Sequence, residues 1–199
     1  MDEIRNYRPL PKMVVSRSDC YLLDAFNPPP VTIESPAIEV MTDLSRVPSA
    51  TINAEDSLTE ANHSMLVRGV RLLIVVNSDL QVEGLVTTTD TLGEKPLLIA
   101  QRLQLTRDEI LVSDVMTPVR SVEAIAIEDV KRASVGHVVA SLKADGRAHA
   151  IVVGKGADGK QHLMGIFSAS QVARQLGVHL QTHEIARTFA EIEAVIAVT

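Results

Sequence analysis

From Ala37 onward the chain aligns with itself, and this internal repeat constrains the fold more than any other feature of the sequence. The apolar run Ile74-Val75-Val76 returns as Ile151-Val152-Val153 after 77 residues. A seven-residue phrase, Gly84 to Asp90, returns after 81 residues as Gly165 to Gln171. The offset grows only in segments that should be loops, as in a tandem repeat with small insertions. The sequence therefore predicts two similar structural units.

Each repeat has the pattern of a β-α-β-β-α unit. A short β-branched stretch precedes a helix with apolar residues at helical spacing, and two strands joined by a turn lead to a closing helix. Ser57 and Glu60 carry the signature of a capping box, and Gly69 and Gly146 stand where a left-handed residue would end the first helix of each repeat. The expected strands are 50–52, 72–76 and 82–86, then 125–127, 148–153 and 162–167.

Other segments flank the two repeats, which we expect at 37–105 and 106–178. Residues 1–36 include Pro28-Pro29-Pro30, a run that favours extended polyproline conformation. This N-terminal arm is either disordered or surface-hugging, or it docks a partner. Residues 179–199 predict a C-terminal amphipathic helix, which packs either on its own domain or across a dimer. Its apolar stripe is Ile185, Phe189, Ile192 and Ile196.

Composition excludes several classes of function. A net charge of −6 argues against general nucleic-acid binding, which needs a basic face. No apolar stretch is long enough to span a membrane, Cys20 is the only cysteine, and the N-terminus lacks a secretory signal, so we expect a cytoplasmic protein.

Common catalytic motifs are absent from the sequence, and we expect that the protein is not an enzyme. His179 and His183 have the spacing of a metal-ligand pair, but surface histidines are the preferred interpretation.

The first copy of the phrase gathers hydroxyl groups and one carboxylate at a strand-to-helix junction. Thr87 and Thr89 can donate hydrogen bonds, the helix start favours an anion, and Asp90 can accept two hydrogen bonds from a vicinal diol such as a ribose. The alternative is purely structural: Thr88 or Thr89 caps the helix while Asp90 favours its positive end.

The order of motifs in each repeat resembles the cystathionine β-synthase (CBS) domain. Val40-Met41-Thr42, a short strand, a capped helix, a two-strand hairpin and the phrase ending at Asp90 follow one another, and Val115-Met116-Thr117 opens the second series. Two such domains in tandem are similar to a CBS pair, or Bateman module, over residues 37–178. The resemblance implies an α/β (α+β) fold, with two β-α-β-β-α repeats packed around a pseudo-two-fold axis.

The resemblance also implies a ligand that contains adenosine: AMP, ADP, ATP or S-adenosylmethionine, and sometimes NAD. In related modules the Asp of the phrase holds ribose, its Thr or Ser residues hold ribose or phosphate, and adenine lies against strands of the other repeat. An arginine at the position of Arg71 lies near phosphate in the regulatory γ subunit of AMP-activated kinase. The principal cleft is then expected at Gly84, Val86, Thr87, Thr89, Asp90, Ile125, Ala126, Arg147, His149 and Ala150. A secondary, weak cleft is expected at Ala50, Thr51, Arg71, Ser168, Ser170 and Gln171.

The second copy of the phrase departs from the pattern, because Gln171 replaces the acid. A charge-assisted hydrogen bond is roughly twice as strong as a neutral one, so we predict that the Asp90 cleft is the principal site. We expect a stand-alone regulatory protein, a homodimer in the manner of the family, that signals to a separate and unidentified effector protein. The alternative is a ligand-free module for dimerisation or partner docking.

Overall fold

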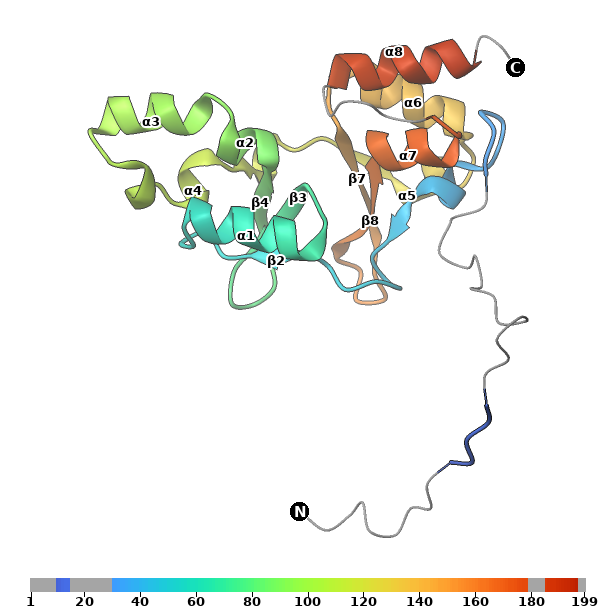
Figure 1. Ribbon diagram of the computed structural model, residues 1–199, viewed down its shortest axis with the longest axis horizontal. Helices are drawn as coiled ribbons and strands as arrows, with labels where there is room; N and C mark the ends of the chain where they lie inside the picture. Colours follow the sequence, from blue (N-terminus) through green and yellow to red (C-terminus); the bar gives the residue numbers. More distant parts are fainter. Residues whose placement is uncertain (1–9, 15–29, 179–184, 197–199) are drawn as a thin grey trace.

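The computed structural model describes residues 10–14, 30–178 and 185–196, and it contains two four-stranded sheets flanked by helices (Figure 1). The first sheet has the order β2 (Thr51–Ile52), β3 (Leu72–Val76), β4 (Val82–Thr87), β5 (Thr117–Pro118). The second has the order β1 (Thr42–Asp43), β8 (Gln161–Ser168), β7 (His149–Lys155), β6 (Ala124–Ala126). The predicted repeat of β-α-β-β-α units is confirmed.

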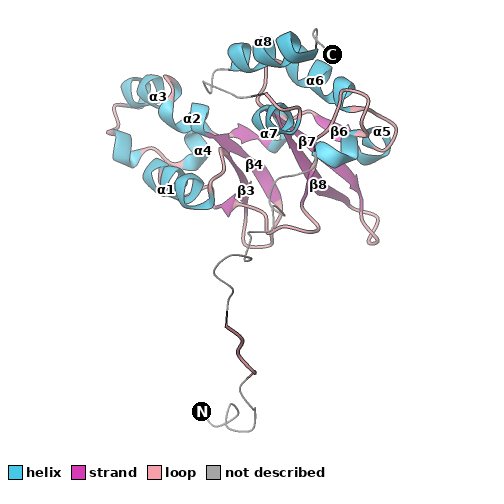
Figure 2. Cartoon of the chain, turned by 45° about the vertical axis from the view of Figure 1, so that its right-hand side comes forward, coloured by secondary structure: helices cyan, strands magenta, loops and turns pink. Residues whose placement is uncertain are grey.

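The helices fall into two groups, one beside each sheet, and the sheets lie between them (Figure 2). The first group is α1 (Leu58–Arg68), α2 (Thr88–Leu92), α3 (Lys95–Leu103) and α4 (Val112–Val115). The second group is α5 (Ile127–Val130), α6 (Val135–Ala144), α7 (Ala169–Gln175) and α8 (Ile185–Ile196). Single turns of 3-10 helix occupy Ala37–Val40, Arg107–Glu109 and Val119–Ser121.

Local signals in the sequence set the ends of several elements. The Ser57 hydroxyl accepts the Glu60 N–H, and the Glu60 carboxylate accepts the Ser57 N–H at 2.8 Å, which completes the predicted capping box of α1. Gly69 ends that helix at φ +64°, and Gly146 follows α6 at φ +61°, as predicted. The strand expected at 125–127 is β6, one residue earlier, because Ile127 already begins α5.

The two repeats exchange their opening strands. Strand β1, at the start of the first repeat, pairs antiparallel with β8 of the second, with Thr42 opposite Ile166. Strand β5, near the start of the second repeat, pairs antiparallel with β4 of the first, with Thr117 opposite Leu85. Each Val-Met-Thr motif therefore lies on the sheet of the other repeat.

The exchange extends into the hydrophobic cores. Ala37 and Val40 are fully buried in the core of the second repeat, whereas Ile110 and Val115 are fully buried in the core of the first. The end of the N-terminal arm also contacts the second repeat: the Gly136 N–H of α6 donates to the Ile33 carbonyl at 2.8 Å. Residues 31–36 thus lie against the second repeat, in line with a surface-hugging arm.

A third apolar cluster joins the two sheets. Leu72, Ile74 and Val76 project from one face of β3 and pack with Leu163 and Ile166 of β8. The opposite face of β3, with Leu73 and Val75, enters the core of its own repeat. Both faces of β3 are buried, which explains its uninterrupted apolar sequence.

Helix α8 packs on its own domain, the first of the two alternatives raised for it. Phe189 and Ile192 are buried in the core of the second repeat, and α8 lies beside α7. The side chains of Ile185 and Ile196 lie outside the described residues, as do Cys20, Pro28, Pro29, His179 and His183. None of the helices in the described ranges has the length and apolarity to cross a membrane.

Candidate functional site

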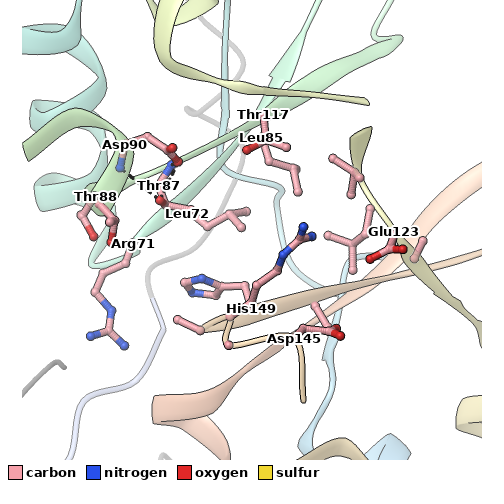
Figure 3. A pocket seen from close by; sticks show the side chains of 18 of the residues that line it. Arg71, Leu72, Leu85, Thr87, Thr88, Asp90, Thr117, Glu123, Asp145 and His149 are labelled. Atoms are coloured by element: carbon pink, nitrogen blue, oxygen red, sulfur yellow. Dashed lines mark hydrogen bonds between the residues drawn. The ribbon is translucent and has the colours of Figure 1, made fainter. Parts of the chain in front are cut away.

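A cavity of about 560 Å³, here called the first cavity, opens between the two sheets (Figure 3). One wall comes from the end of β4 and the start of α2, and the opposite wall comes from β6, β7 and the turn before β7. It is lined by Arg71, Leu72, Leu85, Thr87, Thr88, Thr89, Asp90, Thr117, Val122, Glu123, Ala124, Ile125, Asp145, Gly146, Arg147, Ala148, His149, Ala150 and Ile151. This volume is ordinary for a small-molecule site.

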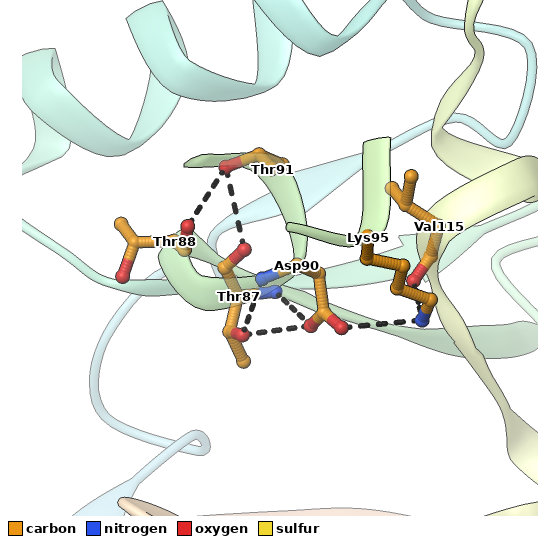
Figure 4. Close-up of polar contacts among 6 residues, drawn as sticks. All are labelled: Thr87, Thr88, Asp90, Thr91, Lys95 and Val115. Carbon is orange, nitrogen blue, oxygen red and sulfur yellow. Dashed lines mark hydrogen bonds and ion pairs between the residues drawn. The ribbon is translucent and has the colours of Figure 1, made fainter. Parts of the chain in front are cut away.

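The Asp90 carboxylate is already held by the protein (Figure 4). Its Oδ2 accepts the Thr87 N–H at 2.9 Å and the Thr87 hydroxyl at 2.7 Å, and the pair caps α2. Its Oδ1 lies 3.3 Å from Lys95 Nζ, which also donates to the Val115 carbonyl. The prediction that Thr88 or Thr89 caps the helix is wrong, because Thr87 is the capping residue; Asp90 does lie in the first turn of α2, as that alternative expected. One lone pair of Oδ1 remains for a ligand, because each carboxylate oxygen can accept two hydrogen bonds.

The other threonines of the phrase divide into two kinds. Thr91 is fully buried and its hydroxyl donates to Asn62 Oδ1 at 2.7 Å, so it belongs to the scaffold. Thr88 and Thr89 line the first cavity, and their hydroxyls have no hydrogen-bond partner among the described residues. The Thr88 N–H donates to the Arg71 carbonyl at 3.1 Å, which fixes the start of α2 against β3. Two hydroxyl groups are thus positioned at the cavity without competing partners.

The opposite wall is apolar at its centre and charged at its rim. Ile125 and Ala150 come from the parallel strands β6 and β7 and are half-buried. Glu123, Asp145 and Arg147 are exposed, and Figure 3 shows Glu123 and Asp145 across the opening from Asp90. A flat apolar group can therefore lie on the strands while polar groups contact the rim.

The glycine that begins the phrase explains how Thr117 reaches the cavity. A Cβ atom at Gly84 would lie 2.6 Å from the Thr117 carbonyl oxygen and 2.9 Å from Met116 Sδ. Only glycine allows β5 to approach β4 this closely. The glycine and the Val-Met-Thr motif are therefore two parts of one contact, and the same holds for Gly165 and Met41 in the other half.

A second cavity, of about 570 Å³, occupies the equivalent place in the other half of the molecule. It is lined by Thr42, Gly69, Val70, Arg71, Leu72, His149, Ile166, Ser168, Ser170, Gln171, Arg174 and Val178. The Thr42 hydroxyl donates to Gln171 Oε1 at 3.1 Å. Arg71, Leu72 and His149 line both cavities, so these three side chains form a shared wall.

The two basic residues of the shared wall, Arg71 and His149, differ in charge near pH 7. Burial, assisted by the positive charge of Arg71, lowers the pKa of His149 to about 4, so the imidazole is neutral near pH 7. Burial and the nearby charge of Arg174 lower the pKa of Arg71, although an arginine stays protonated. The Arg71 guanidinium donates to the Ser170 hydroxyl and points away from Asp90 (Figure 3), so it serves the second cavity more directly than the first.

Comparison with known proteins agrees with this architecture. Residues 37–95 match the family model described as the CBS domain. A conserved protein from Pyrococcus horikoshii is 23% identical, with a TM-score of 0.52 over 76% of this chain and 99% of its own. CBSX2 of Arabidopsis thaliana, solved in complex with AMP, is 22% identical, with a TM-score of 0.51 over 70% of this chain and 94% of its own. The CBS domain pair of protein MJ0100, solved with 5′-methylthioadenosine and S-adenosyl-L-methionine, is 17% identical, with a TM-score of 0.50 over 74% of this chain and 98% of its own.

The chain has the fold of a tandem CBS-domain pair. The family model matches residues 37–95, within the first repeat, and the second repeat has the same order of strands and helices. A search of curated proteins gives no match to this chain.

Most residues predicted for the principal cleft line the first cavity, and three do not. The lining includes Thr87, Thr89, Asp90, Ile125, Arg147, His149 and Ala150. Gly84 lies behind Thr117, Val86 is fully buried in the core of its own repeat, and Ala126 is exposed at the far end of β6.

The predicted secondary cleft is found only in part. Arg71, Ser168, Ser170 and Gln171 line the second cavity. Ala50 and Thr51 do not line it; Thr51 lies on β2, where it pairs with Ile74 of β3.

Sequence reasoning missed the threonines of the exchanged strands, Thr42 and Thr117, which line the second and first cavities. It also missed Thr88, Glu123, Asp145 and Arg174. The Val-Met-Thr motif was a usable signal for both threonines, because it recurs in each repeat. No group of three or more potential metal ligands occurs among the residues that the structure describes.

Proposed function

We propose that this CBS pair is a regulatory, non-catalytic protein that binds an adenosine-containing ligand in the first cavity. The proposal rests on the different chemistry of the two walls of that cavity. Thr88, Thr89 and Asp90 offer hydroxyl and carboxylate groups for a ribose on one wall. Ile125 and Ala150 offer an apolar surface for a flat base on the other. Related folds support the ligand class, since CBSX2 was solved with AMP and the MJ0100 pair with S-adenosyl-L-methionine.

The charges at the first cavity favour a ligand with few negative charges. Its lining holds three carboxylates, on Asp90, Glu123 and Asp145, and two guanidinium groups, on Arg71 and Arg147. The Arg71 group is directed to the other cavity. A triphosphate would meet like charges at the rim, which costs affinity. We therefore expect AMP or S-adenosylmethionine to bind more tightly than ADP or ATP.

The proposal extends to a signal passed on to another polypeptide. Ligand binding can shift the balance between conformations only if the ligand prefers one of them, and a ligand that contacts both repeats meets that condition when their placement changes. The first-repeat helices expose Leu66, Leu97 and Leu98, which can take part in a homodimer or meet an effector protein. We place this activity in the cytoplasm.

Thermal unfolding with each ligand tests the proposal. A ligand that binds only the folded state adds about 2.7 kcal/mol at a hundredfold excess over its Kd, which for a protein of this size raises Tm by roughly 5–10 °C. We expect AMP or S-adenosylmethionine to produce this rise. If AMP, ADP, ATP, S-adenosylmethionine and NAD all leave Tm unchanged at millimolar concentrations, the proposed function is wrong.

The second candidate function is a ligand-free module for dimerisation or partner docking. One observation favours it: the Asp90 carboxylate is already engaged by Thr87 and Lys95. The same experiment separates the two candidates, because a docking module would show no ligand-dependent Tm at all.

A further inference from the structure

A third cavity, of about 330 Å³, opens in the second repeat between α5 and the first turns of α6. Its floor is apolar, since Val130, Val138 and Phe167 line it and are buried. Among the described residues, Ile125 is the only one that it shares with the lining of the first cavity, and it shares none with the second. The third cavity is therefore separate from both spaces described above.

The third cavity lies where the second repeat departs from the first. Residues 127–133 join β6 to Ser134, whereas the shorter stretch 53–56 joins β2 to Ser57. The longer stretch contains α5 and brings Asp129 and Arg132 to the rim of the cavity. The rim therefore has no counterpart in the first repeat, and its ligand can differ from that of the first cavity.

His137 adds a hydrogen-bond donor to this rim. It corresponds to Glu60 at the offset of 77, and both residues complete a capping box. The Ser134 N–H donates to His137 Nδ1 at 3.2 Å, so the neutral imidazole carries its proton on Nε2. In the described part of the chain Nε2 has no hydrogen-bond partner. A carboxylate at this position would repel an anion, whereas the imidazole can donate to one.

The other side of the rim carries a pair of opposite charges. Arg132 donates to Asp129 Oδ1 at 3.0 Å and to the Glu128 carbonyl at 3.1 Å. These contacts leave Asp129 Oδ2 and Arg132 Nη1 without a partner within the ranges that the structure describes. The rim thus offers both an acceptor and donors beside an apolar floor.

These groups together restrict the chemistry of a ligand. An apolar carboxylic acid would meet the donors of His137 and Arg132, but it would place a like charge beside Asp129, which costs affinity. An apolar amine would pair with Asp129 and leave the His137 donor without an acceptor. An apolar α-amino acid carries both groups and no net charge, which also suits a protein with a net charge of −6.

We propose that the third cavity binds an apolar α-amino acid such as leucine. The side chain packs on Val130, Val138 and Phe167, the carboxylate accepts from His137 and Arg132, and the ammonium group donates to Asp129. This site does not depend on the function proposed for the first cavity.

Calorimetric titration of the full chain near pH 7 with leucine and two truncated analogues tests the site. The compound 4-methylpentanoate lacks the ammonium group of leucine, and 3-methylbutylamine lacks its carboxylate. We expect saturable binding of leucine at millimolar concentrations and about tenfold weaker binding of each analogue, the loss typical of a hydrogen bond to a charged group. No saturable binding of leucine, or equal affinity for all three compounds, would overturn the proposal.

Two variants locate the site. His137→Glu copies the capping box of the first repeat and should fold normally, with an unchanged Tm, but it should abolish leucine binding because a carboxylate replaces the donor. Asp129→Asn should weaken leucine binding about tenfold and leave the affinity for 4-methylpentanoate within about twofold. Unchanged leucine affinity in either variant would overturn the proposal.

His63→Glu is the matched control, because it makes the same change of charge at an exposed histidine on α1, outside the third cavity. It should leave the leucine affinity within about twofold, and a loss equal to that of His137→Glu would contradict the site. Saturating AMP should not displace leucine, and displacement would place leucine in the first cavity instead. Failure of adenosine ligands to bind would contradict only the proposed function.

Discussion

The Asp90 carboxylate accepts a hydrogen bond of 2.7 Å from the Thr87 hydroxyl, so the acid that we propose binds a ribose is also part of the capping box of helix α2. A structural role and a proposed binding role therefore fall on one side chain. Any substitution of Asp90 has to be interpreted with two measurements, one of stability and one of affinity.

We expect Asp90→Asn to lower both stability and ligand affinity. Loss of the charged cap should decrease the free energy of unfolding by about 1 kcal/mol, measured by urea unfolding without ligand. The amide can still accept a hydrogen bond, but the charge-assisted contact with a ribose hydroxyl is lost. Calorimetry should show the affinity for AMP or S-adenosylmethionine falling about tenfold.

Glu60→Gln provides the control for Asp90→Asn. Glu60 completes the same kind of capping box on α1, with the Ser57 hydroxyl at 2.8 Å from its carboxylate, and it lies in neither the first nor the second cavity. The loss of stability should be similar, with no change in ligand affinity. Equal ligand affinity in both variants would remove Asp90 from the binding site.

Gly84→Ala should destabilise the protein through a backbone clash. The new methyl group would meet the Thr117 carbonyl oxygen at 2.6 Å, and β5 would have to move away from β4. Overpacking of this kind costs about 1–3 kcal/mol, detectable as a lower Tm. As control, Gly136→Ala in α6 meets no atom closer than 3.4 Å and should be neutral or slightly stabilising, because alanine favours helix.

The equivalent substitution in the second repeat, Gly165→Ala, should be milder than Gly84→Ala. The three atoms nearest to its methyl group would all belong to the side chain of Met41, with Cγ at 2.7 Å, and a methionine can adopt another rotamer. Urea unfolding of the two variants side by side gives the comparison. A larger loss in Gly165→Ala would mean that Met41 is held rigidly in place.

Acid should destabilise the protein through His149. Its pKa is about 4 in the folded state, below the value of 6.5 for the free side chain. Between these values the unfolded state binds more protons, so stability falls as pH decreases from 6.5 to 4, by roughly 3 kcal/mol at most. Above pH 6.5 and below pH 4 this contribution is constant.

His149→Leu, which copies the residue at the equivalent position of the first repeat, Leu72, should remove that part of the pH dependence. Urea unfolding at pH 7 and at pH 4.5 provides the measurement, with the exposed His63→Gln as control. If the native protein and His149→Leu lose the same stability between these pH values, His149 is not the responsible group.

Features encoded by neighbouring residues could be predicted from the sequence. The capping box of Ser57 and Glu60, the left-handed Gly69 and Gly146, and the buried strand from Leu72 to Val76 all depend on contacts within a few positions. Because the two repeats align, each element predicted in one repeat could also be predicted in the other. The hydroxyl cluster of the first cavity followed from the same local pattern.

Long-range pairing could not be predicted, because it leaves no local signal. Thr117 pairs with Leu85, and Thr42 pairs with Ile166 across most of the chain. The Val-Met-Thr motifs served only to align the repeats, so their place in the cavities was missed. The contact of Gln171 with Thr42 was missed for the same reason, since the two residues are far apart in the sequence.

The exchange of β1 and β5 has a consequence for any attempt to divide this protein. A cut between α3 and Arg107 would yield two fragments, each carrying a strand that completes the sheet of the other. Neither fragment should be stable by itself, yet the two should reassemble when mixed. The chain is thus suited to a split-protein design, in which the recovery of ligand binding reports the encounter of its halves.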